Sequence, residues 1–465
     1  PMKIFYILLT FCILSTITYK NILATESTGD DILSSAIISE FPNGFRISTD
    51  INSNDNISSI AINLKIGQRN RGVYQYMCAY TNESYDKWNC NPLISDKQIK
   101  SELFWRTNTR EKYIPPGTNI RYSFQIKTTN GNILDTSQKN FIYHDNRFEW
   151  EKVSNDQITI WYHGPVKARA DKLLLAGNQT LATMQPLLNI TLEQPITTTM
   201  YNNVKEMLDA LPPKSSTISR ELITEGQAFI DDGTILVLGN GRNARGTMSH
   251  ELTHILNHIA GDSIIRPIPS WLDEGLAEYG NIEPGFSYDI ALDYAINTNR
   301  LKPVVLMKNM PGKSEEIIIF YGQSRSIVSM LINDLGQEKL KLFMSELKSG
   351  TSIDLALSKI YNLTSIELYN KWLTKVGAPP YVPPSQSRSI PTAIPMPTVE
   401  PYELGKTIKN TKSLDKTNQN ESNLETIDSS KNEMVFSYTN NLILIGIIIF
   451  IILLAIPIIL IQRKS

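Results

Sequence analysis

The sequence has little cysteine and no excess of charge of either sign. Lys and Arg total 45 and Asp and Glu total 46, which gives a formal net charge of −1. A chain balanced in this way has no electrostatic footprint for phosphates, so we expect no nucleic-acid partner. Three cysteines are too few for a disulfide-rich scaffold. Internal repeats of solenoid period are also missing, which excludes a repeat architecture.

The few cysteines still indicate a compartment. Cys12 falls in an apolar N-terminal segment, and Cys78 and Cys90 remain as an even pair. Such a pair predicts a disulfide bond in an oxidising compartment. Two buried free thiols are the alternative.

Apolar runs occur at both ends of the chain. Residues 1–24 have the pattern of a secretory signal peptide, with Lys3 ahead of the apolar stretch 4–18. Residues 442–461 form an apolar run of about 20 residues, which is long enough to cross a bilayer. Arg463 and Lys464 follow it and favour a cytoplasmic tail at 462–465. The sequence therefore predicts a single-pass cell-membrane protein whose bulk is extracellular and whose C-terminus is cytoplasmic.

Residues 33–147 have the pattern of an all-β domain. Apolar and polar residues alternate in the runs 60–66 and 119–127, as half-buried strands require. Turn signals separate the runs, and Asn130-Gly131 is typical of a hairpin. Short strands with this punctuation predict a β-sandwich of immunoglobulin or fibronectin type III. We find no catalytic group of residues in this stretch.

From residue 148 to residue 377 the pattern changes to mixed strands and helices, which predicts an α+β domain. Expected strands cover 157–162, 195–201 and 234–238, and expected helices cover 166–188 and 204–211. Helices should also fill 324–373, with breaks at Gly336, Gly350 and Asn362. Residues 378–401 are proline-rich and residues 402–440 are polar, so 378–440 should form a disordered stalk.

One short motif in the α+β domain carries metal chemistry. His250 and His254 are four positions apart, with Glu251 directly after the first. On a helix, positions i and i+4 share a face, so both imidazoles can reach one metal ion. This is the H-E-x-x-H pattern of zinc metallopeptidases, in which the glutamate acts on a metal-bound water. Catalytic zinc usually takes three protein ligands, so a third ligand should follow in the run 271–279.

The run 271–279 reads Trp-Leu-Asp-Glu-Gly-Leu-Ala-Glu-Tyr and is a second motif at short range from H-E-x-x-H. The two motifs together resemble the gluzincins, the thermolysin-like zinc peptidases, and more closely the membrane-anchored peptidase MA-like metallohydrolases. Residues 320–324, Phe-Tyr-Gly-Gln-Ser, are similar to a step in those proteins. The resemblance covers about residues 148–377. It implies a thermolysin-like fold, with His250, His254 and Glu274 as Zn²⁺ ligands and Glu251 as general base.

The same region contains three more residues of metal-binding type, Asp273, Glu278 and His258. Glu278 is one helical turn after Glu274, and we expect it to support a ligating histidine. Asp273 is rotated by about 100° from Glu274 and is expected to be exposed or to cap the helix. His258 does not fit the metzincin spacing and is not expected to bind the metal.

Substrate contacts are predicted from three further features. Tyr321 is a candidate donor to the oxyanion, with Gln323 and Ser324 beside it and Tyr279 as the weaker competitor. The G-x-M-E-N strand of gluzincin aminopeptidases does not occur, so an endopeptidase is predicted. The strand 234–238 is expected to be an edge strand that pairs with a peptide substrate. The rival hypotheses are a surface adhesion protein with a structural metal site and a metal-free pseudoenzyme.

Overall fold

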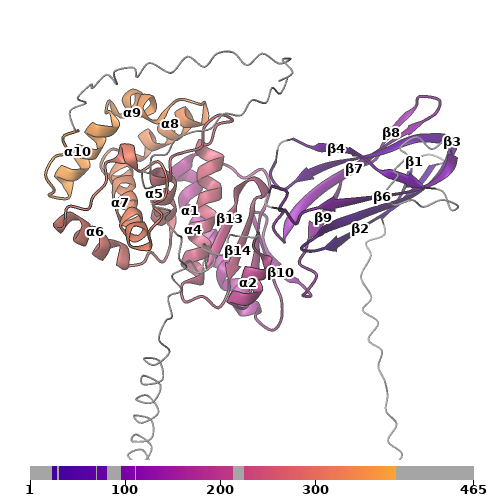
Figure 1. Cartoon of the computed structure of the whole chain (residues 1–465), viewed down its shortest axis with the longest axis horizontal. Coiled ribbons are helices and arrows are strands. Elements are labelled where there is room, and N and C mark those ends of the chain that lie inside the picture. Colours follow the sequence, from indigo (N-terminus) through magenta and orange to yellow (C-terminus); the bar gives the residue numbers. More distant parts are fainter. Residues whose placement is uncertain are drawn as a thin grey trace, which may run out of the picture. The chain divides into compact units, whose positions relative to one another are not determined.

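The computed structural model describes residues 24–28, 31–69, 71–80, 96–109, 111–212 and 225–383 (Figure 1). Cys90, most of the expected signal peptide, most of the expected stalk and the apolar run 442–461 lie outside these residues. Within the described part of the chain, none of the helices has the length and apolar character that a membrane crossing needs. The signal peptide, the stalk and the membrane anchor therefore stay predictions. Cys78 is disulfide-bonded, but because Cys90 is not described its pairing with Cys90 also stays a prediction.

The first part of the chain is a β-rich region, residues 24–143. Its strands are β1 (Ala24–Thr28), β2 (Asp31–Glu40), β3 (Gly44–Ile66), β4 (Val73–Tyr76), β5 (Cys78–Tyr80), β6 (Asp96–Arg106), β7 (Thr118–Thr128), β8 (Ile133–Asp135) and β9 (Lys139–Tyr143). In β7 the side chains alternate between buried and half-buried positions, as the sequence period predicted. The β-rich character of this region is thus confirmed.

The long strand β3 joins all of these strands into one sheet. Its first half pairs with β2 and β6, and its second half pairs with β4 and β7. The register shifts between Asn52 and Ile57, where a bulge lets a strand bend and change neighbours. The strands are therefore hydrogen-bonded as one nine-stranded sheet in which the two halves of β3 have different neighbours, and the immunoglobulin-type sandwich stays a prediction.

The second part is an α+β region with a five-stranded sheet. Its strands are β10 (Glu151–Ser154), β11 (Ile158–Tyr162), β12 (Ile196–Tyr201), β13 (Gly226–Phe229) and β14 (Thr234–Leu238), in the order β10-β11-β12-β14-β13. β14 pairs with β12 on one side and β13 on the other, and all five of its residues are buried. The prediction that 234–238 forms an edge strand is wrong. The short β13, at the end of this order, is the edge strand instead.

The helices pack on this sheet and on one another (Figure 1). They are α1 (Lys167–Leu188), α2 (Val204–Ala210), α4 (Ala244–Gly261), α5 (Ser270–Gly280), α6 (Ser287–Asn297), α7 (Ser314–Asn333), α8 (Gln337–Lys348), α9 (Ile353–Tyr361) and α10 (Ser365–Lys375), with 3-10 turns η1 (Ile230–Asp232) and η2 (Val304–Leu306). The expected breaks at Gly336, Gly350 and Asn362 are confirmed. Helix α6 was not predicted. Met248, Leu252 and Ile255 of α4 share one core with α1 and the sheet.

The β-rich region packs against the opposite side of the five-stranded sheet. Leu236 and Leu238 of β14 and Tyr201 of β12 belong to the same apolar core as the β-rich strands. Both regions therefore belong to one compact unit of the chain.

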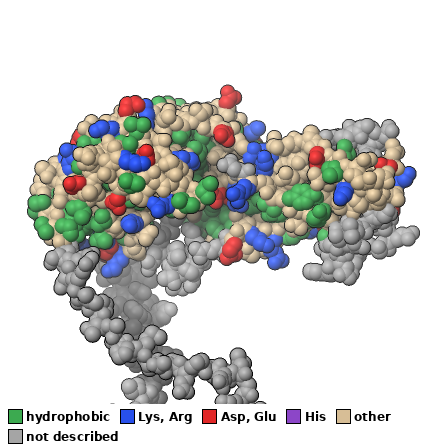
Figure 2. Space-filling model, turned by 90° about the horizontal axis from the view of Figure 1, so that it is seen from above, with side chains coloured by type: hydrophobic (Ala, Val, Ile, Leu, Met, Phe, Trp, Pro, Cys, Tyr) green, Lys and Arg blue, Asp and Glu red, His purple; other side chains and the backbone are tan. Residues whose placement is uncertain are grey.

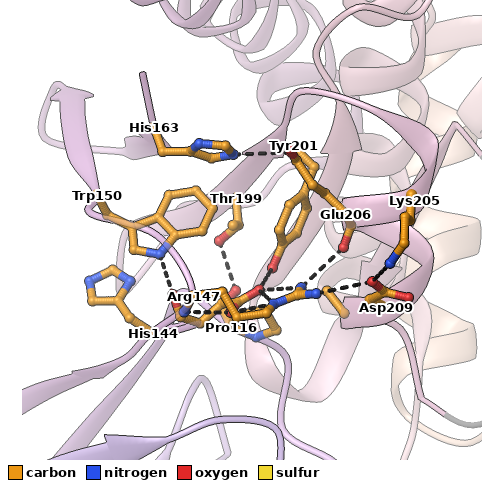
Figure 3. Close-up of polar contacts among 12 residues, drawn as sticks. Pro116, His144, Arg147, Trp150, His163, Thr199, Tyr201, Lys205, Glu206 and Asp209 are labelled. Carbon is orange, nitrogen blue, oxygen red and sulfur yellow. Dashed lines mark hydrogen bonds and ion pairs between the residues drawn. The ribbon is translucent and has the colours of Figure 1, made fainter. Parts of the chain in front are cut away.

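A polar network that includes Arg147, Trp150 and Tyr201 lies where the two regions join (Figure 3). Asp145 is fully buried, and it accepts hydrogen bonds from Arg147 Nη2 at 2.6 Å and from the Tyr201 hydroxyl at 2.9 Å. Trp150 Nε1 donates to the Asp145 carbonyl at 2.7 Å. Because a buried charge is tolerated only when it is paired, this network fixes the connection between the regions.

Figure 2 shows basic and acidic side chains interspersed over one face of the unit. Mixed charges of this kind produce no strong field of one sign over that face.

Candidate metal centre

Helix α4 presents both histidines of the H-E-x-x-H motif to the same side. Its other face is buried, so the helix is held against α1 and the sheet. His250 and His254 face each other with their Nε2 atoms 3.0 Å apart. The spacing of four residues thus brings two nitrogen donors to one point, as the sequence predicted.

Helix α5 brings the third donor to that point. Glu274 Oε2 lies 3.4 Å from His250 Nε2 and 3.5 Å from His254 Nε2. Gly275 makes this placement possible, because a Cβ atom at that position would lie 2.6 Å from the Ser324 carbonyl oxygen of α7. Helices α5 and α7 therefore approach closely, and Glu274 is held over α4.

The three donors fit zinc. Ligand atoms about 2.0–2.1 Å from one tetrahedral zinc ion lie roughly 3.3 Å from each other, which is close to the spacings of these three atoms. Glu274 Oε2 is buried, and no group among the described residues donates a hydrogen bond to it. A buried carboxylate oxygen without a donor fits a metal ligand. His250, His254 and Glu274 are thus a zinc site that leaves a coordination position for water.

Each ligating histidine has a carboxylate on its other nitrogen. His250 Nδ1 lies 2.8 Å from Glu278 Oε1, and His254 Nδ1 lies 2.9 Å from Asp273 Oδ2. Such a partner fixes the ring and its tautomer and leaves Nε2 for the metal. Glu278 lies where it was expected. Asp273 does not, because it was predicted to be exposed or to cap α5.

Asp273 is tied into the site by further contacts from α4. Asn257 Nδ2 donates to Asp273 Oδ1 at 3.0 Å, and His258 Nε2 lies 3.3 Å from Asp273 Oδ2. Burial raises the pKa of the Asp273 carboxyl, but His254 and His258 outweigh burial and hold that pKa well below its usual range. His258 is also paired with Asp262 and so lies outside the metal cluster.

Glu251 lies on the wall of a cavity of about 380 Å³ that contains the metal site. The cavity is lined by α4, α5, α7 and β13, through residues Gly226, Gln227, Ala228, Ile230, His250, Glu251, His254, Asp273, Glu274 and Tyr321. The backbone N–H of Ala228 donates to Glu251 Oε2 at 2.7 Å. One oxygen of the Glu251 carboxylate is therefore held by the edge strand.

Tyr321 lines the same cavity, but its setting differs from the prediction. It lies in the middle of α7 rather than at a helix start, and its ring centroid is 6.0 Å from that of His250. Burial, followed by the charge of Glu274, raises the pKa of its hydroxyl, which therefore stays protonated. The competitor Tyr279 points elsewhere, because its hydroxyl donates to Asn333 at 3.4 Å.

Gln323 and Ser324 were expected to lie beside Tyr321 in the cavity, but another tyrosine packs on Tyr321 instead. Gln323 exchanges hydrogen bonds with the backbone of Lys302, and Ser324 is buried against α5, so neither lines the cavity. Tyr288 of α6 instead packs on Tyr321, with ring centroids 5.5 Å apart. No sequence pattern pointed to Tyr288, since α6 itself was not predicted.

Comparison with known proteins supports this geometry. Residues 176–378 match the family described as the Peptidase MA superfamily, and no curated protein matches the chain. Similar solved structures include a two-domain M1 zinc metallopeptidase, as a mutant bound to L-tryptophan, with 10% identity, 77% of this chain and 92% of that chain covered, and a TM-score of 0.32.

The M1 zinc metallopeptidase from Deinococcus radiodurans gives 10% identity, coverage of 76% and 91%, and a TM-score of 0.32. A bromine derivative of BhCBM56 gives 11% identity, coverage of 26% and 99%, and a TM-score of 0.16. TM-scores this low add no argument. The assignment of the site therefore rests on the family match and on the geometry of the three donors.

Proposed function

Because residues 176–378 match the Peptidase MA superfamily and hold three donors with the spacing of a zinc site, we propose that the protein is a zinc peptidase that hydrolyses internal peptide bonds of extended polypeptides at the cell surface. One observation carries this proposal. The cavity around the zinc site runs along the edge strand β13, so an extended chain can bind beside the catalytic groups.

The edge strand supplies backbone groups for the substrate. β13 is hydrogen-bonded to β14 on one side, and Gly226, Gln227 and Ala228 line the cavity on the other. An extended peptide can add to such an edge through main-chain hydrogen bonds. We therefore assign the pairing with a peptide substrate to β13, and not to the strand 234–238 that the sequence predicted for it.

The lining of the cavity favours an endopeptidase. Its acidic side chains are Glu251, Asp273 and Glu274, and Asp273 and Glu274 are engaged with the histidines of the site. Glu251 is needed for the chemistry. The described lining thus has no spare carboxylate to bind the free amine of a substrate, which fits the missing aminopeptidase motif.

The residues of the cavity account for the hydrolysis. Zinc, when bound, lowers the pKa of a water molecule towards about 7 and polarises the scissile carbonyl. Glu251, with one oxygen held by Ala228, would accept a proton from the attacking water through its other oxygen and would deliver it to the leaving amine. Tyr321 lines the same cavity, and its hydroxyl would donate a hydrogen bond to the oxygen that becomes negative.

Replacing Tyr321 by phenylalanine should lower kcat by about tenfold or more, with little change in KM. The ring keeps its packing on Tyr288, so the fold and the zinc content should not change. Steady-state kinetics on a peptide substrate tests this. Tyr279→Phe is the matched control, because its hydroxyl points away from the cavity. An unchanged kcat in Tyr321→Phe would mean that Tyr321 only packs.

The cell-surface part of the proposal rests on the sequence. The signal pattern of 1–24, the apolar run 442–461 and the basic residues after it favour a single-pass anchor with the peptidase outside the cell. The disulfide bond of Cys78 is consistent with an oxidising compartment. Protease accessibility of the intact protein on living cells tests the orientation, and a C-terminal tag reachable from outside would contradict it.

Cleavage of a peptide library tests the activity itself. The protein without its apolar C-terminal run should cut within the peptides, and a zinc chelator should abolish cutting until zinc is restored. Removal of single N-terminal residues would indicate an exopeptidase. A zinc-loaded protein that cleaves nothing and binds a surface partner would favour the rival adhesion hypothesis.

A further inference from the structure

The hairpin of β13, η1 and β14 lies between helix α4, which carries Glu251, and the β-rich region. On one side, a Cβ atom at Gly226 would lie 2.4 Å from Thr247 Cγ2 and 2.8 Å from Glu251 Cγ, so β13 lies directly on α4. On the other side, the Phe229 ring packs on Tyr113, with centroids 5.4 Å apart. The position of β13 over Glu251 therefore depends on helix α4 and on Tyr113 of the β-rich region.

The tip of this hairpin, η1, is bound by a turn of the β-rich region. This turn, Gly67–Arg69, directly follows β3. Gln68 N donates to the Asp231 carbonyl at 3.2 Å, and Arg69 Nη2 pairs with Asp232 Oδ1 at 2.9 Å. The Asp232 side chain is only 6% exposed, so its ion pair is shielded from solvent on that side.

The two turns also interlock sterically. A Cβ atom at Gly67 would lie 2.4 Å from Asp232 Cα, and one at Gly233 would lie 2.6 Å from Gln68 Cγ. Both glycines have positive φ values, +56° and +58°, which side-chain-bearing residues rarely adopt. The Asp232 backbone thus lies against Gly67 and the Gln68 side chain lies against Gly233, so a shift of one turn presses on the other.

We propose that the turn Gly67–Arg69 clamps the hairpin tip and thereby holds β13 where the Ala228 N–H binds Glu251. Arg69 and Asp232 are then positioning residues for hydrolysis, although neither touches the cavity around the metal. The catalytic part of this inference rests on the proposed function. It gives the β-rich region a role in the chemistry of the site.

The size of the effect follows from the tolerance of catalytic geometry. Groups that act on a substrate have to be held within about 0.5 Å of their productive positions. Loss of Arg69 would leave the Asp232 carboxylate buried without its cation, which is costly and is relieved by movement of η1. Because η1 continues β13 without a break, that movement reaches Ala228 and Glu251.

The test compares Arg69→Ala with Arg46→Ala in the same full-length chain. Arg46 lies in β3 and pairs with Glu40 at 2.7 Å and with Glu102, so its loss removes two ion pairs from the β-rich region. We expect Arg69→Ala to lower kcat by about tenfold to a hundredfold at normal zinc content. Arg46→Ala should leave kcat unchanged. Arg69→Lys should restore part of the activity, and adding Asp232→Asn to Arg69→Ala should also restore part of it, because asparagine leaves no buried charge without a partner.

Hydrogen exchange separates the clamp from the peptidase assignment. Amides of residues 225–233 should exchange faster in Arg69→Ala than in the unmodified protein or in Arg46→Ala. Unchanged exchange there would overturn the clamp, and unchanged kcat with faster exchange would overturn its catalytic role. If the unmodified protein cleaves no peptide, the proposed function has failed, whereas the exchange rates still decide whether the turn holds the hairpin.

Discussion

Glu251→Gln is expected to lower kcat by at least about a hundredfold while the zinc content stays normal. Glutamine has nearly the shape of glutamate, and its amide oxygen can still accept the N–H of Ala228. It cannot accept a proton from the attacking water, so only the proton transfer is lost. Turnover of a peptide substrate and elemental analysis of the same sample measure both quantities.

A matched control separates the loss of the base from a general effect of removing a charge. Glu283 pairs with Arg245 of α4 at 2.7 Å and lies outside the cavity lining. Glu283→Gln therefore removes an acidic group near the same helix, and kcat should not change. Near-normal turnover in Glu251→Gln would remove the assignment of Glu251 as base.

The arrangement of the α+β region was predictable where it depends on local pattern. Strands β11, β12 and β14 and helix α1 lie where apolar periodicity placed them, and helix α4 lies where the H-E-x-x-H motif required a helix. The order of the strands was not predictable, because it depends on pairing between distant segments. β13 has only four residues and no strand pattern of its own, so the edge of the sheet was assigned to β14.

In the candidate site, too, contacts within one helix were predictable from the sequence and contacts between helices were not. The four-residue spacing of His250 and His254 places them together on any helix, and their Nε2 atoms are adjacent. The contact of Asp273 with His254 depends on how α5 crosses α4, which no spacing in the sequence specifies. The β-rich sheet is similar, since its continuity depends on the bend of β3.

Glu274→Ala is expected to remove most of the zinc, and with it the activity. The substitution leaves two nitrogen donors at a site where zinc takes three protein ligands. The released space lies beside helix α7, so the helices can keep their packing through Gly275. Zinc content after dialysis, with the thermal unfolding of the same sample, shows whether metal is lost from a folded protein.

The neighbouring acidic residues provide the comparison that decides the ligand. Glu278→Ala and Asp273→Ala each remove the carboxylate behind one histidine but leave all three metal donors in place. A partner of this kind typically contributes about tenfold to a hundredfold in metal affinity. Both variants should therefore bind zinc more weakly than the unmodified protein and more tightly than Glu274→Ala. Loss of the metal in Glu278→Ala together with its retention in Glu274→Ala would reverse the two assignments, because the ligating carboxylate has to be the one whose removal empties the site.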